Sequence, residues 1–195
     1  ELRLSNDYQS RVVGVALKDR AAILPAGHSA NAAYWWDDAA GHFVTSSYYM
    51  DALPKWAADF NKQHHTAPKY NIKTSTEGVT MTFLMAEAAL KGERLGQGDA
   101  TDMLTVSISS TDAIGHKFST RCKENHDVYM QLDKDLAAFL QTLDATVGKG
   151  NYLFFLTADH GAAHNYNMLR SHKYPAGGWD YDATTQALND HLKGK

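Results

Sequence analysis

The sequence predicts an α/β domain in which helices cover both faces of a mostly parallel sheet. Residues 103–156 read as a strand, a long amphipathic helix and a second strand. Such a crossover is right-handed in nearly all proteins and places its two strands parallel. The second strand, residues 152–156, is continuously apolar, which is typical of a parallel strand buried on both faces. With 195 residues, 44% of them hydrophobic and 21% charged, the chain has the size of one such domain, residues 1–195.

The amino-terminal residues predict a strand, a loop and a hairpin. Residues 11–17 are rich in β-branched side chains and indicate a strand buried in the sheet. Residues 21–33 are mostly small and contain Pro25 and Gly27, so we expect a loop there. Residues 34–45 place aromatic and β-branched side chains on both sides of a polar turn. This pattern is typical of a small β-hairpin, which we expect as an excursion from the main sheet.

Four helices follow from the pattern of apolar residues. Residues 51–63 carry Pro54 in the first turn, where a helix tolerates proline. Residues 80–90 are apolar nearly all round, which is typical of a helix packed on a sheet. A last helix is expected over residues 184–195. The clearest helix, residues 125–147, has an apolar stripe formed by Leu132, Leu136, Phe139, Leu140, Leu143 and Val147.

Charge and composition exclude several function classes. The formal net charge is -3 and the sequence shows no basic stripe, so no nucleic-acid partner is expected. No apolar run is long enough to span a bilayer, so no membrane partner is expected either. Cys122 is the only cysteine, which rules out an internal disulfide and a thiolate cluster. Any metal site must therefore rely on carboxylates and imidazoles.

Polar side chains follow each of the three strands that we expect to be parallel. They are Lys18 and Arg20 after the first strand, Asp112 and His116 after the second, and Asp159 and His160 after the third. The carboxyl ends of parallel strands meet at one edge of a sheet, so these groups are expected to converge. Two cations and two Asp–His pairs are the groups that a two-metal phosphoryl-transfer site needs.

Lys18 and Arg20 are two residues apart, which places both side chains on the same side of an extended backbone. A guanidinium and an ammonium that converge in this way suit the oxygens of a phosphate. Considered alone, such a pair is explained more often by a solvated loop than by a binding site.

The two Asp–His pairs have different spacings. Asp112 and His116 are four residues apart, which places both side chains on one face of a helical turn. Asp159 and His160 are adjacent and can reach one ion only if the backbone turns after the strand, which Gly161 permits. The competing explanation for each pair is a capping aspartate beside a packed histidine.

Three segments resemble the phosphate-irrepressible alkaline phosphatases of the type I phosphodiesterase/nucleotide pyrophosphatase branch, within the alkaline phosphatase superfamily. They are Val-Ala-Leu-Lys-Asp-Arg-Ala-Ala-Ile-Leu-Pro-Ala-Gly-His at 15–28, Ser-Ser-Thr-Asp-Ala-Ile-Gly-His at 109–116, and Leu-Thr-Ala-Asp-His-Gly-Ala-Ala-His-Asn at 156–165. The likeness covers nearly the whole chain, and the three segments together are specific. It implies an alkaline phosphatase-like α/β fold, present here in part.

The resemblance also implies roles for the site residues. Asp112 and His116 would bind one zinc ion, Asp159 and His160 would bind a second, and Lys18 and Arg20 would be catalytic and contact the non-bridging oxygens of the substrate phosphate. The implied substrates are small-molecule phosphate monoesters, and the implied location is periplasmic or secreted. A monoester dianion offers more charge to two metals and two cations than a diester does, so the cations favour monoesters.

The departures from the family pattern predict an incomplete site. In that family a threonine nucleophile, an aspartate ligand and an asparagine come from sequence before Glu1, and a last histidine ligand comes from sequence after Lys195. We therefore expect this chain to be an inactive fragment of a parent that hydrolyses monoesters through a phosphothreonine. The family usually has a longer stretch at residues 63–78, so this region is either short or lacks a segment.

Two alternatives remain open from the sequence. One is a phosphodiesterase, nucleotide pyrophosphatase, sulfatase or phosphomutase that uses the same metal frame. The other is a domain that binds metal or phosphate without turnover. His164 either contacts the metal ligands from behind or is a loop residue. The sequence leaves the physiological substrate, the identity of the metal and the oligomeric state open.

Overall fold

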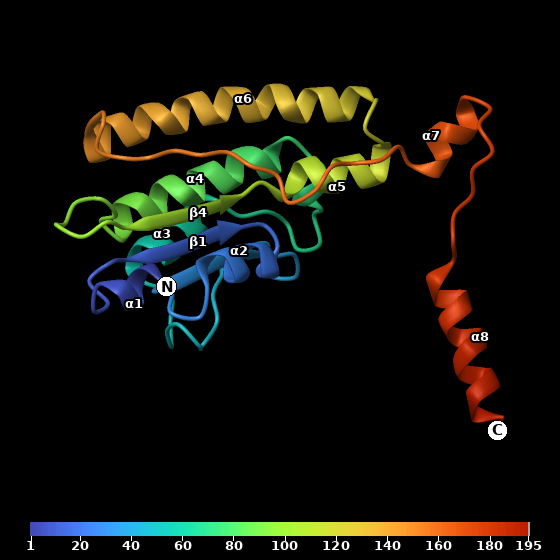
Figure 1. The fold of residues 1–195 in the computed structure, drawn as a ribbon, viewed down its shortest axis with the longest axis horizontal. Helices are drawn as coiled ribbons and strands as arrows, with labels where there is room; N and C mark the ends of the chain where they lie inside the picture. Colours follow the sequence, from blue (N-terminus) through green and yellow to red (C-terminus); the bar gives the residue numbers. More distant parts are fainter. Residues whose placement is uncertain (195) are drawn as a thin grey trace.

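The computed structural model, which describes residues 1–194, is built around a sheet with helices on both faces (Figure 1). The strands are β1 Val12–Ala16, β2 Ala32–Asp37, β3 His42–Val44 and β4 Met103–Ser107. Their order in the sheet is β3-β2-β1-β4. β1 is parallel to β2 and to β4, whereas β3 is antiparallel to β2. The predicted α/β class with a mostly parallel sheet is confirmed.

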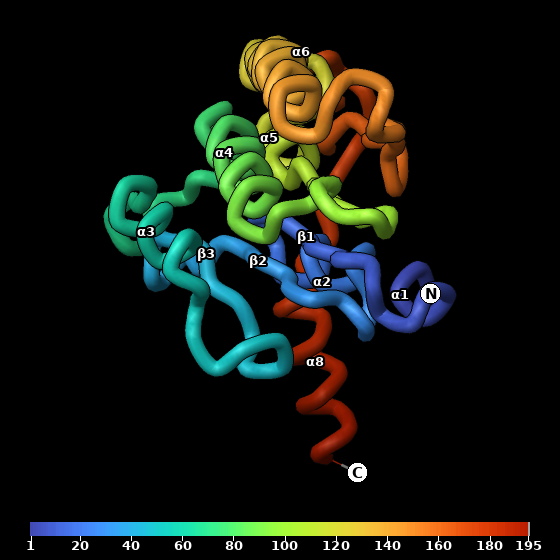
Figure 2. Tube along the Cα trace, turned by 90° about the vertical axis from the view of Figure 1, so that its left-hand side faces the viewer, coloured from blue at the N-terminus to red at the C-terminus, as the bar shows by residue number. Residues whose placement is uncertain are grey.

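Helices form a layer on each side of this sheet. The helices are α1 Leu2–Ser5, α2 Asp19–Ala26, α3 Lys55–Gln63, α4 Glu77–Gly92, α5 Ser109–Phe118, α6 Lys123–Leu143, α7 Tyr166–Ser171 and α8 Tyr181–Lys193, with single turns η1 Ile72–Thr74 and η2 Asp144–Gly148. α2 packs on β1 and β2 from one side, and α4 packs on β1 and β4 from the other (Figures 1 and 2). α6 packs outside α4. Within residues 1–194, no helix combines the length and the apolar character needed to cross a bilayer.

The predicted helices are present with shifted ends. α4 extends the helix expected at 80–90 by one turn or less at each end, and α6 with η2 covers the helix expected at 125–147. α3 begins only at Lys55 because Pro54 occupies the position before the first helical turn. α8 begins three residues before the predicted start, and the predicted end at Lys195 lies outside the described residues.

The loop predicted at residues 21–33 is wrong, because α2 occupies its first part. Alanine is a strong helix former, and four of the eight residues of α2 are alanine or leucine. Small side chains also let α2 approach β1 closely. A Cβ at Gly14 would lie 2.1 Å from the carbonyl oxygen of Ala22. The local sequence of residues 21–26 is compatible with a loop or a helix, and packing against β1 selects the helix.

The hairpin predicted at residues 34–45 is present as β2 and β3, but it belongs to the main sheet. β2 pairs with β1, with Tyr34 opposite Val15. Tyr34, Trp36 and Phe43 are buried, and the rings of Trp36 and Phe43 meet edge to face at 5.3 Å. Burial of these aromatic side chains under the helices explains why the hairpin is part of the sheet and not an excursion from it.

The strand predicted at residues 152–156 is wrong. These residues return along α6 in an extended form (Figure 1), yet no backbone hydrogen bond joins them to β4 within the described part of the chain. The side chains of Leu153 and Phe155 are 89% and 71% exposed. An apolar segment becomes a strand only where a neighbouring strand pairs with its backbone groups. Farther along the chain, α8 stands clear of the sheet (Figures 1 and 2).

Candidate functional site

The carboxyl ends of β1 and β4 bring a lysine and an aspartate together. Lys18 follows β1, and Asp112 lies in the first turn of α5, which begins directly after β4. Lys18 Nζ is 2.6 Å from Asp112 Oδ2, and 28% of the Asp112 side chain is exposed. The hydrogen bond from Lys18 is the main reason that the pKa of Asp112 is lowered from its usual value. The carboxylate is therefore charged over a wide pH range.

Two histidines lie on the other oxygen of this carboxylate. His116 Nε2 is 3.1 Å from Asp112 Oδ1, as the four-residue spacing on a helix predicts. His160 Nε2 approaches the same oxygen at 3.9 Å, and it lies 3.6 Å from Asp159 Oδ2. A hydrogen bond with the Gly161 carbonyl, followed by the charge of Asp159, raises the pKa of His160. Five of the six predicted site residues therefore form one continuous cluster.

Arg20 is the site residue that the structure does not bring into this cluster. It is the second residue of α2, so the backbone after Lys18 is helical and not extended. Within residues 1–194, no ion pair joins the guanidinium of Arg20 to Asp112 or Asp159, whereas Lys18 contacts Asp112. The extended backbone expected between the two cations is wrong, because α2 begins at Asp19.

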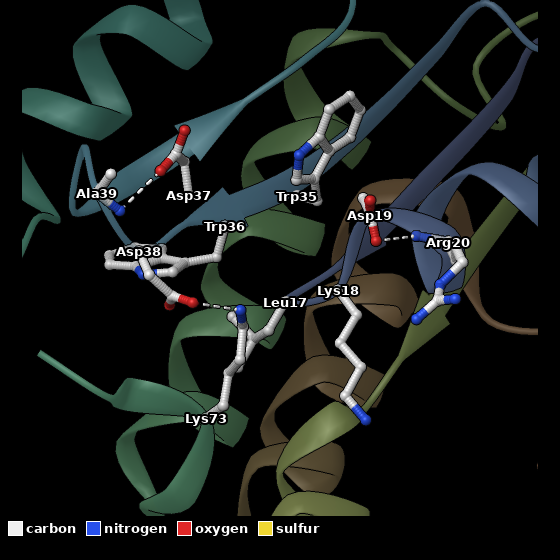
Figure 3. A pocket seen from close by; sticks show the side chains of 10 residues that line it. All are labelled: Leu17, Lys18, Asp19, Arg20, Trp35, Trp36, Asp37, Asp38, Ala39 and Lys73. Atoms are coloured by element: carbon white, nitrogen blue, oxygen red, sulfur yellow. Dashed lines mark hydrogen bonds and ion pairs between the residues drawn. The ribbon is translucent and has the colours of Figure 1, made fainter. Parts of the chain in front are cut away.

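A cavity of about 460 Å³ opens beside Lys18 at the ends of β1 and β2 (Figure 3). Lys18 and Arg20 border it, together with Trp35 and Lys73. Lys73 pairs with Asp38 at 2.7 Å. The sequence analysis missed Trp35 and Lys73 as residues near the site. Trp35 lies near the end of β2, which is parallel to β1, so the rule that sites form at the carboxyl ends of parallel strands applies to it as well.

The donor set of the cluster suits zinc in its chemistry but is not assembled as a coordination shell. Carboxylate and imidazole groups are ordinary zinc ligands. Among residues 1–194, however, no three His, Cys, Asp or Glu side chains are arranged to hold one ion. The ammonium of Lys18 occupies one oxygen of Asp112, and most of the Asp159 side chain is exposed. The other oxygen of Asp112, Oδ1, is the one that faces His116 and His160.

His164 and the segment that carries Asp159 and His160 contact the end of α5. Thr120 Oγ1 and His164 Nδ1 share a hydrogen bond, and the backbone N–H of Asn165 donates to Ser119 Oγ at 3.2 Å. His164 therefore lies in the loop before α7, and its hydrogen bond goes to Thr120 and not to a predicted metal ligand. Ser119 and Thr120 carried no signal in the sequence, because isolated hydroxyl residues after a helix are common.

Comparison with known proteins gives the same family from sequence and from structure. The sequence profile described as Type I phosphodiesterase / nucleotide pyrophosphatase matches residues 5–186. The alkaline phosphatase PafA of Elizabethkingia meningoseptica is 39% identical over 244 aligned positions, which cover 100% of this chain and 44% of PafA. The alkaline phosphatase PhoV of Synechococcus elongatus is 41% identical over 225 positions, with 91% of this chain and 41% of PhoV covered. The crystal structure of wild-type PafA superposes with a TM-score of 0.85 at 38% identity, over 99% of this chain and 46% of that chain.

The chain thus spans less than half the length of these relatives. The PafA alignment extends over 244 positions although this chain has 195 residues, so PafA has additional residues between the matched segments.

Proposed function

The chain belongs to the type I phosphodiesterase/nucleotide pyrophosphatase family, and from this membership we propose that it is part of a phosphatase acting on small-molecule phosphate monoesters. The names of two relatives support a phosphatase, since both are alkaline phosphatases. The observation that carries the proposal is the cluster at the sheet edge, where Lys18, Asp112 and His160 come from three separate segments.

Two Asp–His pairs would hold the metal ions of this phosphatase. Asp112 and His116 would hold one zinc ion, and Asp159 and His160 would hold the second. A bound zinc ion polarises a phosphoryl oxygen and lowers the pKa of a bound water. Support comes from the chemistry of the donors and from the 3.9 Å approach of His160 to Asp112.

Lys18 would stabilise the substrate phosphate once it leaves Asp112. Its ammonium already lies at the sheet edge among the Asp–His pairs, so a rotation of a flexible side chain is enough to change its partner. A positive charge aimed at the phosphoryl oxygens is most valuable in the transition state, where negative charge accumulates. Arg20 would join Lys18 at the phosphate, since both residues border the same cavity (Figure 3).

A phosphodiesterase of the same family is the second candidate, and one observation favours it. Of the two predicted cations, only Lys18 has an ion pair with an aspartate of the Asp–His pairs among residues 1–194. One cation discriminates less strongly between a dianionic monoester and a monoanionic diester than two cations do. The family description itself also includes phosphodiesterases.

The chain alone would lack turnover. The relatives are more than twice as long. The family resemblance implies a threonine nucleophile outside residues 1–195. Export to the periplasm or secretion is part of the same proposal and rests on the resemblance.

The test measures hydrolysis of an aryl phosphate monoester and the matched diester, using the longest polypeptide that contains this chain. We expect monoester turnover to exceed diester turnover and to be abolished by a zinc chelator. We expect K18A to reduce monoester turnover about 100-fold or more, by analogy with the loss of one charge-stabilising group in other active sites. The control is K134A, because Lys134 is exposed on α6, away from the site.

Each outcome separates the candidates. Diester turnover above monoester turnover would assign the protein to the phosphodiesterases. Chelator-insensitive turnover would contradict the zinc assignment. If neither ester is hydrolysed, the domain binds metal or phosphate without turnover.

A further inference from the structure

The segment that carries Asp159 and His160 is held by few contacts. Residues 153–165 are not paired with the sheet. Within residues 1–194, every hydrogen bond that joins this segment to the preceding part of the chain ends on residues 116–120. The position of the second Asp–His pair therefore depends on the end of α5, the helix that carries the first pair.

Two hydroxyl groups make these contacts. Ser119 Oγ accepts a hydrogen bond from the Asn165 backbone N–H at 3.2 Å, and Thr120 Oγ1 bonds His164 Nδ1. A longer contact of 3.5 Å runs from Asn165 Nδ2 to the His116 carbonyl. We call Ser119, Thr120, His164 and Asn165 the clasp. It joins a ligand-bearing helix to the ligand-bearing segment without including any ligand side chain.

Ser119 has a backbone conformation that argues for a specific role. Its φ and ψ are 84° and 170°, a region that only glycine enters without strain, and the residue is fully buried. Glycine would satisfy the backbone at this position at lower cost. Serine adds the hydroxyl group that receives the Asn165 N–H. The strain is thus combined with a contact that only the serine side chain supplies.

We propose that Ser119 and Thr120 are positioning residues that hold Asp159 and His160 against α5, so that the two Asp–His pairs face one another. The inference rests on the proposed function, because it concerns the metal ligands named there. Groups behind metal ligands commonly set metal affinity by fixing the orientation of the ligands. The clasp does so here by fixing the backbone that carries them.

The test compares the double variant S119A/T120V with the control S171A/T184V in this chain. The control makes the same two chemical changes at hydroxyl groups in α7 and α8, whose bonds are local. Zn²⁺ alone is titrated in competition with a chromophoric chelator, and amide hydrogen exchange is measured without zinc. We expect S119A/T120V to weaken Zn²⁺ binding about tenfold or more and to speed exchange in residues 153–163. Exchange in β1 should stay unchanged, as should every property of the control.

The variant S119G separates the hydroxyl group from the backbone conformation. It relieves the strained φ but removes the acceptor for Asn165, so we expect it to weaken Zn²⁺ binding as S119A does. If S119G binds Zn²⁺ like the unsubstituted chain, the hydroxyl group is unnecessary and the proposal is overturned. Should the double variant fail to fold, as judged by exchange in β1, T120V alone is used.

Other outcomes also test the positioning role of Ser119 and Thr120. Faster exchange with unchanged Zn²⁺ affinity would overturn the positioning role, and so would unchanged exchange in residues 153–163. If the unsubstituted chain binds no Zn²⁺, the four ligands named here do not hold the ion without the ligands that the family resemblance places outside this chain. The clasp is then judged by exchange alone, where faster exchange in the double variant supports it and equal exchange overturns it.

Discussion

At the scale of single residues, Asp112 shows how local spacing and long-range contact combine. Its approach to His116 follows from a separation of four residues on a helix, and the sequence predicts it. Its ion pair with Lys18 joins residues that are 94 positions apart, and the sequence predicts only that both lie at one sheet edge. The partner of a flexible lysine depends on which acceptor is nearest in the folded chain.

Asp59 on α3 offers a test of electrostatics at this scale, away from the site. Hydrogen bonds from Lys55 and then from Lys62 lower the pKa of Asp59 to about 2. Because the pKa is lower in the folded state, the stabilisation is fully present above the unfolded value of 3.8 and is lost as the pH falls toward 2. We expect D59N to melt at a slightly lower temperature than the unsubstituted chain at pH 6. The difference should disappear near pH 2.

Thermal unfolding followed by circular dichroism across this pH range provides the measurement, and a carboxyl NMR titration reports the pKa directly. A carboxyl pKa near 4 for Asp59, or a melting difference that grows as the pH falls, would contradict the ion pairs of α3.

At the scale of elements, one glycine, Gly14, permits the close approach of α2 to β1. A Cβ at Gly14 would meet the Ala22 carbonyl oxygen at 2.1 Å, far inside contact distance, so α2 would have to move. We expect G14A to lower the free energy of unfolding by about 1–3 kcal/mol, as overpacking in a core does. Urea denaturation measures this change.

The control for this prediction is G98A. A Cβ at Gly98 has no neighbour within 4 Å, so we expect a change below about 0.5 kcal/mol. Equal stability of G14A and G98A would show that α2 does not pack on β1 as described. The same contact explains why a run of small residues after β1 forms a helix where the sequence predicts a loop.

At the scale of the whole molecule, residues 152–156 lie outside the sheet, although β4 has a free edge. All five residues of β4 are only partly buried, and its outer edge is unpaired in the described chain. The apolar residues that follow α6 return along this helix without joining the sheet (Figure 1). Their apolar character is clear from the sequence, but the sequence does not show whether their backbone groups pair with the free edge of β4.

Substitution in this segment tests that conclusion. Leu153 and Phe155 are largely exposed, so we expect L153S/F155S to change the free energy of unfolding by less than about 0.5 kcal/mol. The matched control L17S/F43S replaces the same residue types at fully buried positions, where each loss costs about 2–5 kcal/mol. Urea denaturation compares the two. A large loss of stability in L153S/F155S would show that the segment is a buried strand in solution.

The sequence by itself determined the α/β class, the strands at residues 11–17 and 103–108, most helices, and the polar groups that follow these two strands. These follow from local periodicity and from the rule that parallel strands end at one edge. Only the tertiary structure decided that α2 is a helix, that the hairpin lies in the sheet, that Lys18 pairs with Asp112, and that residues 152–156 stay unpaired. Each of these depends on which distant segment packs alongside, and short-range sequence patterns contain no information on that neighbour.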